Sequence, residues 1–321
     1  MNNPNLVEFS PNPEAPALVI GAAGVDIVGR IKGELHMGTS NPAQIRTSFG
    51  GVARNVAENL ARLGQPVRLL TVVGEDQAGD QLLANAAGAG VDVQAVRRTR
   101  QHPTGSYIGM INASGELQLA MDDMRALAEL SPEYLREHAD LFQDASLVFF
   151  DANLPKETIR TLLSLAQKAS LPVCVDPTSL SLAGKIKSLL PRLSMITPNS
   201  AEVAFLADLP APATRRREAL LAAKQLVSRG VGMVIVTMAA LGVCYATSQT
   251  SGHISAIRTE IVDPTGAGDA LTAAVLFALL NDIPLDDAIR LGVSAASLTL
   301  RHPGAVLPDL SLEKLYDHLV I

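Results

Sequence analysis

Two glycines flank an alanine and precede an aspartate near the C-terminal end of the chain. The segment consists of Gly266, Ala267, Gly268 and Asp269. It leads into residues 270–280, an apolar stretch that predicts a helix. Each glycine at a helix start lowers stability by roughly 0.5–1 kcal/mol relative to alanine. The two glycines therefore indicate that the backbone at this position must be free of side chains. Because unpaired N–H groups at a helix start bind anions, the segment predicts a phosphate site.

Asp269 is the residue of this segment that can do acid–base chemistry. No Lys-Ser or Lys-Thr pair follows Gly268, so the segment is not a Walker A phosphate loop. A carboxylate beside a phosphate is electrostatically unfavourable unless it accepts the proton of an attacking hydroxyl group. Aspartate is also a common helix cap. The residues alone leave both interpretations of Asp269 open.

The elements that must position this segment follow an alternating pattern. From residue 146 onward, short apolar runs alternate with amphipathic stretches, which predicts a parallel sheet covered by helices on both faces. The predicted strands are 147–150, 173–175, 195–196, 233–237 and 242–246. The predicted helices are 156–168, 182–190, 200–207, 214–229, 268–280, 286–300 and 312–319. The expected fold class is therefore α/β.

The first half of the chain begins with the same alternation. Its predicted elements are a strand at 17–21, a helix at 53–63, a strand at 67–73 and a helix at 76–87. Two other stretches, 28–49 and 104–121, look extended, contain glycine turns and lack a crossover helix. We expect them to form a small β layer that projects from one domain. That domain is expected to span residues 17–321 and to follow a polar tail, residues 1–16.

Charge and composition exclude several classes of protein. The formal net charge is −6, and basic residues are scattered except at 215–217, so we expect no nucleic-acid partner. Hydrophobic residues make up 48% and charged residues 18% of the 321, which is typical of a folded globule. The longest apolar stretch is too short to cross a membrane, and residues 1–16 do not resemble a signal peptide. The expected location is the cytoplasm.

Two motifs resemble the signatures of the ribokinase-like family of carbohydrate and nucleoside kinases, also called the PfkB family. Residues 263–269, Asp-Pro-Thr-Gly-Ala-Gly-Asp, are similar to its C-terminal signature. Gly50, Gly51 and Asn55 match its N-terminal Gly-Gly-x-x-x-Asn motif. The resemblance implies a ribokinase-like fold and an ATP-dependent kinase activity. It also implies that Asp269 is the catalytic base and that the N–H groups of residues 266–268 stabilise the transferring phosphoryl group.

The resemblance assigns further residues to the nucleotide. Asn199 and Glu202 match the family's Asn-x-x-Glu motif, which implies that Glu202 organises Mg²⁺ and phosphate, partly through water. The same spacing is a good capping box, and both roles can hold together. Thr237 and Gly242 match the strand and turn that meet ATP in the family. Many relatives have Gly where Ala239 stands, so we expect a less close approach of this turn to the phosphate.

A monovalent cation completes the cofactors that the resemblance implies. In relatives, backbone carbonyl groups near Asp263 and in the turn at residues 301–304 correspond to a potassium site that shapes the anion site. The expected cofactors are therefore ATP and Mg²⁺, together with K⁺ at Asp263.

On the substrate side, the family places a sugar-binding aspartate after the first strand, where Asp26 stands. A carboxylate can accept hydrogen bonds from two adjacent hydroxyl groups, as a ribose diol requires. An aspartate in a turn after a strand also occurs without any ligand. By resemblance, Asp26, Gly50, Gly51 and Asn55 line the sugar pocket.

Finer features favour one acceptor. Ribokinases usually carry Lys where Val52 stands, whereas residues 50–64 and 123–124 resemble bacterial pseudouridine kinases. Arg54 and Asn153 fit the substrate pocket of such an enzyme, although an arginine on a helix face is more often a surface salt-bridge partner. The predicted acceptor is the 5′-hydroxyl group of pseudouridine. Ribose, another nucleoside and a fructose-type sugar are the alternatives.

Two other classes of function stay open alongside the kinase. A protein that binds a sugar or nucleoside without catalysis would keep the fold, but the intact Gly-Ala-Gly-Asp and Asn-x-x-Glu motifs argue against it. The alternative of a dinucleotide-dependent oxidoreductase depends on Gly21 and Gly24, which follow the first predicted strand. Their spacing is not Gly-x-Gly-x-x-Gly and no helix follows promptly, so we give this class little weight.

The small β layer has two expected roles in a kinase of this family. As a lid over the sugar, residues 28–49 and 104–121 would exclude water, so that ATP is not hydrolysed. In relatives the same layer often forms a dimer interface, which also covers exposed strand edges. We therefore expect a homodimer that binds a small-molecule substrate.

Overall fold

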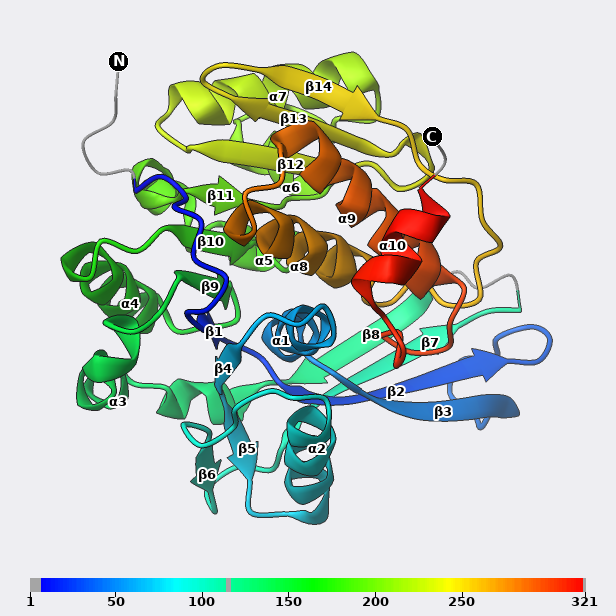
Figure 1. Ribbon diagram of the computed structural model, residues 1–321. Helices are drawn as coiled ribbons and strands as arrows, with labels where there is room; N and C mark the ends of the chain where they lie inside the picture. The colour runs from blue at the N-terminus through cyan, green and yellow to red at the C-terminus, as the bar shows by residue number, and fades with distance from the viewer. Residues whose placement is uncertain (1–6, 114–116, 320–321) are drawn as a thin grey trace.

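The fold is given by a computed structural model, which describes residues 7–113 and 117–319 (Figure 1). Three parts of the expected domain organisation lie outside the described residues: 1–6 of the tail, 114–116 of the second extended stretch and 320–321 at the end of the domain. Within the described part of the chain, none of the helices has the length and the hydropathy that crossing a lipid bilayer requires.

The centre of the fold is a large sheet, which in the described part of the chain has eight strands in the order β14-β13-β12-β11-β10-β9-β1-β4. The strands are β1 (Ala17–Ile20), β4 (Val67–Leu70), β9 (Leu147–Asp151), β10 (Val173–Asp176), β11 (Met195–Ile196), β12 (Met233–Thr237), β13 (Val243–Thr247) and β14 (Ser251–Ile254). From β12 to β4 all pairings are parallel, as expected. β13 instead pairs antiparallel with β12, because the connection at residues 238–242 is too short for a crossover helix, and β14 pairs antiparallel with β13.

Helices cover both faces of this sheet (Figure 1). The helices of the described residues are α1 (Val52–Arg62), α2 (Gln77–Gly88), α3 (Pro132–Glu137), α4 (Lys156–Lys168), α5 (Leu180–Ala183), α6 (Ser200–Leu206), α7 (Arg216–Ser228), α8 (Ala267–Leu280), α9 (Leu285–Leu300) and α10 (Leu312–His318). Of these, α2 packs on β2 and β5, and α10 packs on α9. Alternate residues of β1 point to opposite faces. Leu18 and Ile20 share a core with α4, α6 and α7, whereas Ala17 and Val19 share a core with α1, α8 and α9. Both faces are therefore buried, as in other parallel sheets.

A second, smaller sheet contains most of the two extended stretches (Figure 1). Within the described residues its order is β3-β2-β7-β8, formed by β2 (Gly24–Ile31), β3 (Ala43–Gly50), β7 (Gly105–Ile111) and β8 (Leu117–Asp123). β2 begins earlier than expected, so Asp26 lies inside a strand and not in a turn. The element that follows Gly21 and Gly24 is thus a strand, whereas a dinucleotide-binding loop requires a helix there.

Two predicted elements are each divided in the structure. The strand expected at 67–73 ends at Leu70, and β5 (Val72–Gly74) leaves the main sheet to pair with β6 (Arg97–Thr99). The carbonyl of Thr71 accepts a hydrogen bond from the Arg97 N–H (2.9 Å), which turns the chain toward β6. The helix expected at 182–190 is replaced by α5, which ends before Gly184, and a separate 3₁₀ turn at Lys187–Arg192.

The arrangement brings two helix starts to one edge of the large sheet. α1 and α8 pack against each other (Figure 1). The last residues of β9 and β10, Asp151 and Asp176, mark the carboxyl edge of the parallel strands. Ligands of open α/β sheets bind outside this edge. The candidate site is therefore expected where α1, α8 and β2 meet these strand ends.

Candidate active site

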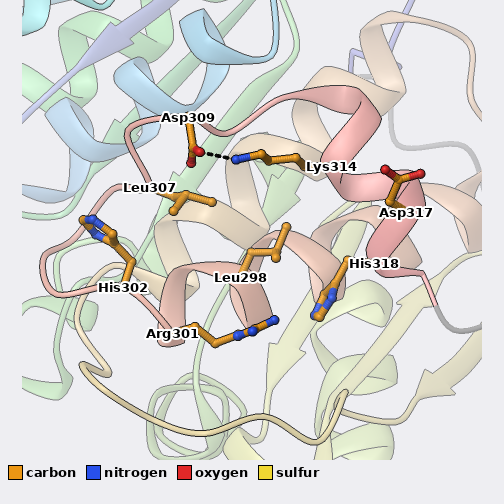
Figure 2. A pocket seen from close by; sticks show the side chains of 8 residues that line it. All are labelled: Leu298, Arg301, His302, Leu307, Asp309, Lys314, Asp317 and His318. Carbon is orange, nitrogen blue, oxygen red and sulfur yellow. Dashed lines mark hydrogen bonds and ion pairs between the residues drawn. The ribbon is translucent and has the colours of Figure 1, made fainter.

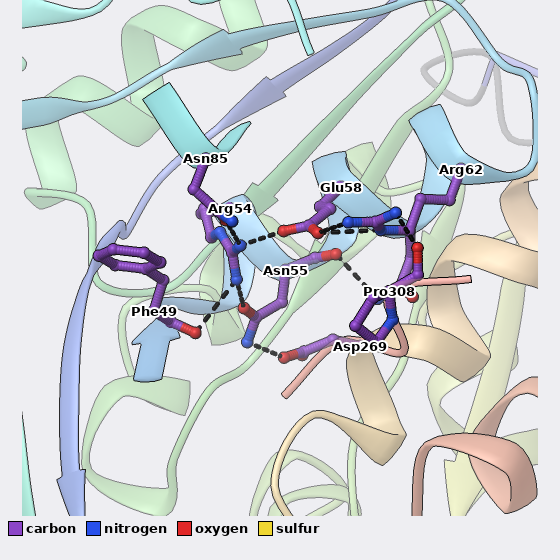
Figure 3. Close-up of polar contacts among 9 residues, drawn as sticks. Phe49, Arg54, Asn55, Glu58, Arg62, Asn85, Asp269 and Pro308 are labelled. Carbon is purple, nitrogen blue, oxygen red and sulfur yellow. Dashed lines mark hydrogen bonds and ion pairs between the residues drawn. The ribbon is translucent and has the colours of Figure 1, made fainter. Parts of the chain in front are cut away.

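Asp269 lies in the first turn of α8 and is held by a residue of α1. Its Oδ2 accepts a hydrogen bond from Nδ2 of Asn55 (2.8 Å; Figure 3). The surrounding protein atoms keep water from the Asp269 carboxyl group, and this desolvation raises its pKa to about 7. The Asn55 hydrogen bond opposes this rise, whereas the negative charges of Asp151 and Asp26 add to it. A carboxyl group with a pKa near neutrality can both take and release a proton at physiological pH.

The start of α8 is open to an anion. Gly266 has a φ of +77°, in the left-handed region, and a Cβ placed on it would overlap the carbonyl group of Ala305. Gly268 has no atom within 4 Å of such a Cβ, so space lies next to it. In the described part of the chain no side chain caps this helix. The first N–H groups of α8, from Ala267 to Asp269, have no partner inside the helix and can bind phosphate oxygens.

Asp26 projects from β2 and depends on the glycine pair of the N-terminal motif. Burial raises the pKa of Asp26 to about 6, against the lowering effect of the positive charges of Arg54 and Arg46. A Cβ on Gly50 would overlap the Asp26 carboxylate, so this position has room only for glycine. Gly51 has a φ of +94°, and a Cβ on it would overlap the Ala22 backbone. The glycine pair therefore permits both the position of Asp26 and the start of α1.

Arg54 is buried, with 4% exposure, so its interpretation as a surface residue is wrong. Its guanidinium group donates to the Phe49 carbonyl (3.1 Å), to Asn55 Oδ1 (3.1 Å) and to Asn85 Oδ1 (2.5 Å), and it forms an ion pair with Glu58 (Figure 3). The predicted contact between Arg54 and a substrate stays a prediction.

Asp151 is a site residue that the sequence analysis missed. It is fully buried, and its Oδ2 accepts from the N–H groups of Ala22 (2.7 Å) and Ala53 (3.0 Å). Its Oδ1 accepts from Nδ2 of Asn153 (2.8 Å), so the predicted pocket residue Asn153 is tied to Asp151. Burial raises the pKa of Asp151 in spite of these hydrogen bonds. Asp151 thereby joins the turn after β1, the start of α1 and the residues after β9.

Asp176, at the end of β10, is a second missed residue. Burial raises its pKa well above the usual value, and the negative charges of Asp269 and Glu202 raise it further. The available sequence signal for Asp151 and Asp176 is an aspartate directly after a buried strand. The carboxyl ends of adjacent parallel strands share an edge, so these carboxyl groups gather around Asp269.

The predicted nucleotide residues follow β11 and β12: Asn199 and Glu202 belong to the start of α6, Thr237 ends β12, and Gly242 ends the turn after it. Asn199 caps α6, and its N–H donates to Oε2 of Glu202 (2.9 Å), so the expected capping box is present. Thr237 lies beside Asn199 in a parallel bridge. Burial raises the pKa of Glu202. Gly242 has a φ of +90°, and a Cβ on it would overlap the carbonyl group of Ile254. Ala239, for which the resemblance led us to expect glycine, also has a left-handed φ of +48°.

Asp263 organises the loop before α8. It is buried, and its carboxylate accepts from the N–H groups of Thr265 (3.0 Å) and Gly304 (3.0 Å). It also forms an ion pair with Arg46 of the small sheet. In the described part of the chain no group of three or more His, Cys, Asp or Glu residues could hold a metal ion. Potassium binding near Asp263 stays a prediction.

A surface pocket contains none of the predicted catalytic, substrate or nucleotide residues, although Arg301 and His302 of the predicted potassium turn line it (Figure 2). It is formed by α9, α10 and the segment between them. Its lining residues are Leu298, Arg301, His302, Leu307, Asp309, Lys314, Asp317 and His318. Asp309 and Lys314 form an ion pair across part of it. The pocket is therefore distinct from the space around Asp269.

Comparisons with known proteins agree with this architecture. Residues 16–311 match the pfkB family of carbohydrate kinases. The chain is 31% identical to the pseudouridine kinase of Escherichia coli K12 over 92% of this chain and 93% of that protein. It is also 31% identical to the guanosine-inosine kinase of Exiguobacterium acetylicum, over 87% of this chain and 92% of that protein.

The fold is shared with solved ribokinase structures. The structure of Arabidopsis thaliana ribokinase complexed with ribose and ATP has a TM-score of 0.84 and is 25% identical, with 96% of this chain and 99% of that chain covered. The ribokinase of Thermotoga maritima has a TM-score of 0.81 at 24% identity. This protein therefore has the ribokinase-like fold and belongs to the pfkB family of carbohydrate kinases.

Proposed function

We propose that this kinase transfers the γ-phosphoryl group of ATP to the 5′-hydroxyl group of pseudouridine, with Asp269 as the catalytic base. The observation that carries the proposal is the position of Asp269: it is partly buried, held by Asn55 and located at the open start of α8. Its pKa of about 7 suits a group that takes a proton at neutral pH.

The proposed reaction is an in-line displacement. Asp269 takes the proton of the 5′-hydroxyl group while that oxygen forms a bond to the γ-phosphorus. The bond between the γ-phosphorus and the oxygen that bridges to the β-phosphate breaks, and ADP leaves with that electron pair. N–H groups of residues 266–268 would donate to the transferring phosphoryl group, whose charge needs fixed donors. Asn55 keeps Asp269 oriented toward the acceptor.

The residues on the neighbouring strands fit a nucleotide and a hard cation. Asn199 pairs with Thr237 in a parallel bridge, and Gly242 ends the 3₁₀ turn that follows β12. These three residues would contact ATP. Glu202 would hold Mg²⁺ through water, which suits an ion that keeps several waters. When bound, Mg²⁺ neutralises charge on the phosphates. We include K⁺ at the Asp263 loop in the proposal, on the basis of the family resemblance.

The acceptor assignment rests on two supports. One is the similarity to the pseudouridine kinase of Escherichia coli, together with Val52 at the position where ribokinases usually carry Lys. The other is the buried Asp26, whose carboxylate can accept hydrogen bonds from both hydroxyl groups of a ribosyl diol. The equal identity to a guanosine-inosine kinase favours a purine nucleoside as the second candidate.

The small sheet would act as the lid of this site and as the interface of a homodimer. Paired residues on neighbouring strands share a face, which places Asp26 on one face of the sheet. The opposite face carries exposed apolar side chains whose exposure lies between 42% and 69%. They are Ile45, Ile108, Leu119 and Met121. A contiguous apolar face of this kind favours burial against a second copy of the chain.

The acceptor is tested by incubating the purified protein with MgATP and single candidates: pseudouridine, uridine, guanosine, inosine, adenosine, ribose and fructose. We expect the highest kcat/KM for ADP release with pseudouridine, and a product with phosphate on the 5′ oxygen. Phosphorylation of a free sugar without phosphorylation of pseudouridine would reject the acceptor and keep the kinase. ATP binding without phosphorylation of any acceptor would favour a protein that binds its ligand without catalysis.

A further inference from the structure

We propose that Arg54 is a positioning residue for this kinase: it fixes which end of the Asn55 amide faces Asp269. The inference rests on the proposed role of Asp269 and deepens it. Arg54 then acts through Asn55 on the base and does not contact the substrate, in contrast to the role that the resemblance implies for it.

The geometry of the Asn55 side chain carries the inference. Arg54 Nη1 donates to Asn55 Oδ1 (3.1 Å), and Asn55 Nδ2 donates to Asp269 Oδ2 (2.8 Å; Figure 3). A guanidinium group has only donors, whereas an ionised carboxylate has only acceptors. If the amide were turned over, its NH₂ group would face the guanidinium group and its oxygen would face the carboxylate. Both contacts would be repulsive, so Arg54 selects the orientation that supplies a donor to Asp269.

Arg54 is itself held in place by protein groups. Glu58 forms an ion pair with it, Asn85 accepts a hydrogen bond from it (2.5 Å), and the Phe49 carbonyl accepts another (3.1 Å). Arg54 is 4% and Glu58 is 3% exposed. The remaining nitrogen, Nε, is buried and has no hydrogen-bond partner in the described part of the chain. Protein groups therefore engage both terminal nitrogens of the guanidinium group, and protein atoms cover its unpaired Nε.

Arg62, which pairs with the second carboxylate oxygen of Glu58, provides a matched control for Arg54. Arg62 donates to Oε1 of Glu58 from Nε (2.9 Å) and from Nη2 (2.5 Å). Arg62 belongs to the same helix and pairs with the same carboxylate, but it lies on the side away from Asn55 and also donates to the Pro308 carbonyl (Figure 3). Removal of either arginine leaves Glu58 with one cationic partner. Only the removal of Arg54 releases the Asn55 amide.

The charged groups around Asp269 determine whether the loss of Arg54 raises or lowers the pKa of Asp269. Asp26 from β2 and Asp151 from β9 act on it with negative charge, and Arg54 from α1 acts with positive charge. The charge of Asp269 in turn raises the pKa of the buried Asp176 at the end of β10. Burial, Asp151 and Asp26 raise the pKa of Asp269, whereas the Asn55 hydrogen bond and Arg54 lower it. Loss of Arg54 should therefore raise this pKa further and leave less of the base ionised at neutral pH.

The test compares Arg54→Met with Arg62→Gln, using the acceptor that the wild-type enzyme phosphorylates. We expect Arg54→Met to move the acid limb of kcat/KM upward by about one pH unit and to lower kcat, with little change in the acceptor KM. Arg62→Gln should keep the wild-type profile. In an Asn55→Ala background, Arg54→Met should add a smaller shift, because the charge of Arg54 still acts on Asp269 but the amide no longer links the two residues.

A measurement that needs no turnover separates this inference from the proposed function. In ¹⁵N-asparagine-labelled protein, the side-chain NH₂ signals of Asn55 should titrate with Asp269 and lose that titration in Arg54→Met. If Arg54→Met does not fold, Arg54→Lys gives the same readouts with a smaller shift, since lysine keeps the charge but not the forked geometry. An increased acceptor KM with an unmoved acid limb would overturn the inference, as would a full shift without Asn55. Inactivity of the wild type toward all acceptors would instead reject the proposed function.

Discussion

At the scale of single residues, the candidate site contains several carboxyl groups, and their different surroundings indicate different roles. Asp269 and Asp26 have pKa values raised to about 7 and about 6, mainly by burial. Asp151 is surrounded by backbone N–H donors and holds three segments together. Asp269 is the one of these three that lies at an open helix start. This combination favours Asp269 as the group that exchanges a proton with the acceptor.

The pKa of Asp269 predicts the pH dependence of turnover. Below about pH 7 the carboxyl group becomes protonated and cannot take a proton, so kcat/KM should fall about tenfold per pH unit on the acid side. The measurement is kcat/KM from pH 5 to 9 with saturating MgATP. A rate that stays level down to pH 5 would show that no group with such a pKa is needed as a base.

The sequence motifs predicted some of the residue contacts and missed others. Asn55 and Asp269 lie 214 positions apart, yet family signatures mark both, and the structure joins them by a hydrogen bond. Asp151 and Asp176 have no local signature, because a single aspartate after a strand is common in turns. Their place beside Asp269 depends on the order of strands in the sheet, which sequence spacing does not contain.

At the scale of elements, the start of α8 depends on two glycines for different reasons. Gly266 needs a left-handed backbone and has no room for a Cβ, whereas Gly268 has open space around it. The first is therefore a structural requirement of the loop. The second is free to serve the approach of a phosphate group.

The two glycines should respond differently to replacement by alanine. Gly266→Ala should lower the free energy of unfolding by about 1–3 kcal/mol, because it combines left-handed strain with an overlap at Ala305. Gly268→Ala should keep or raise stability by about 0.5–1 kcal/mol, since alanine favours helix, yet its methyl group would obstruct phosphate binding. Denaturant unfolding and the KM for ATP check both. An unchanged KM for ATP and unchanged kcat in Gly268→Ala would contradict the anion site.

Element boundaries were predictable wherever local pattern sets them. The helix expected at 156–168 is α4 with the same bounds, because its apolar periodicity and its flanking Pro155 act locally. The break between β4 and β5 was not predictable, since it depends on Arg97 donating to the Thr71 carbonyl from a distant part of the chain. The antiparallel edge was also missed, although the short connection at 238–242 carried the necessary signal.

At the scale of the whole molecule, the small sheet presents two different faces. One face carries Asp26 and Arg46, and Arg46 pairs with Asp263 in the loop before α8. This ion pair connects the small sheet to the segment that contains the candidate base. The other face is apolar and exposed around Ile108 and Met121. The first face therefore belongs to the site, and the second is available for association.

The proposed homodimer should dissociate when a charged side chain is introduced on the apolar face of the small sheet. The protein should have about twice the 33.7 kDa mass of one chain in light scattering after size exclusion. Ile108→Glu should give a monomer, because it places a charge in the centre of the apolar face. Leu221→Glu, at a residue with 58% exposure on α7, is the matched control and should stay dimeric. A wild-type monomer, or a dimer that tolerates Ile108→Glu, would contradict the interface.

The central claim is that Asp269 is the base of a phosphoryl transfer, and Asp269→Asn tests it most directly. The amide keeps the size of the side chain but cannot take the proton, so turnover should fall at least about 10³-fold. Calorimetric titration should show that the variant still binds MgATP with an affinity close to that of the wild type. Near-normal turnover in Asp269→Asn would contradict the account.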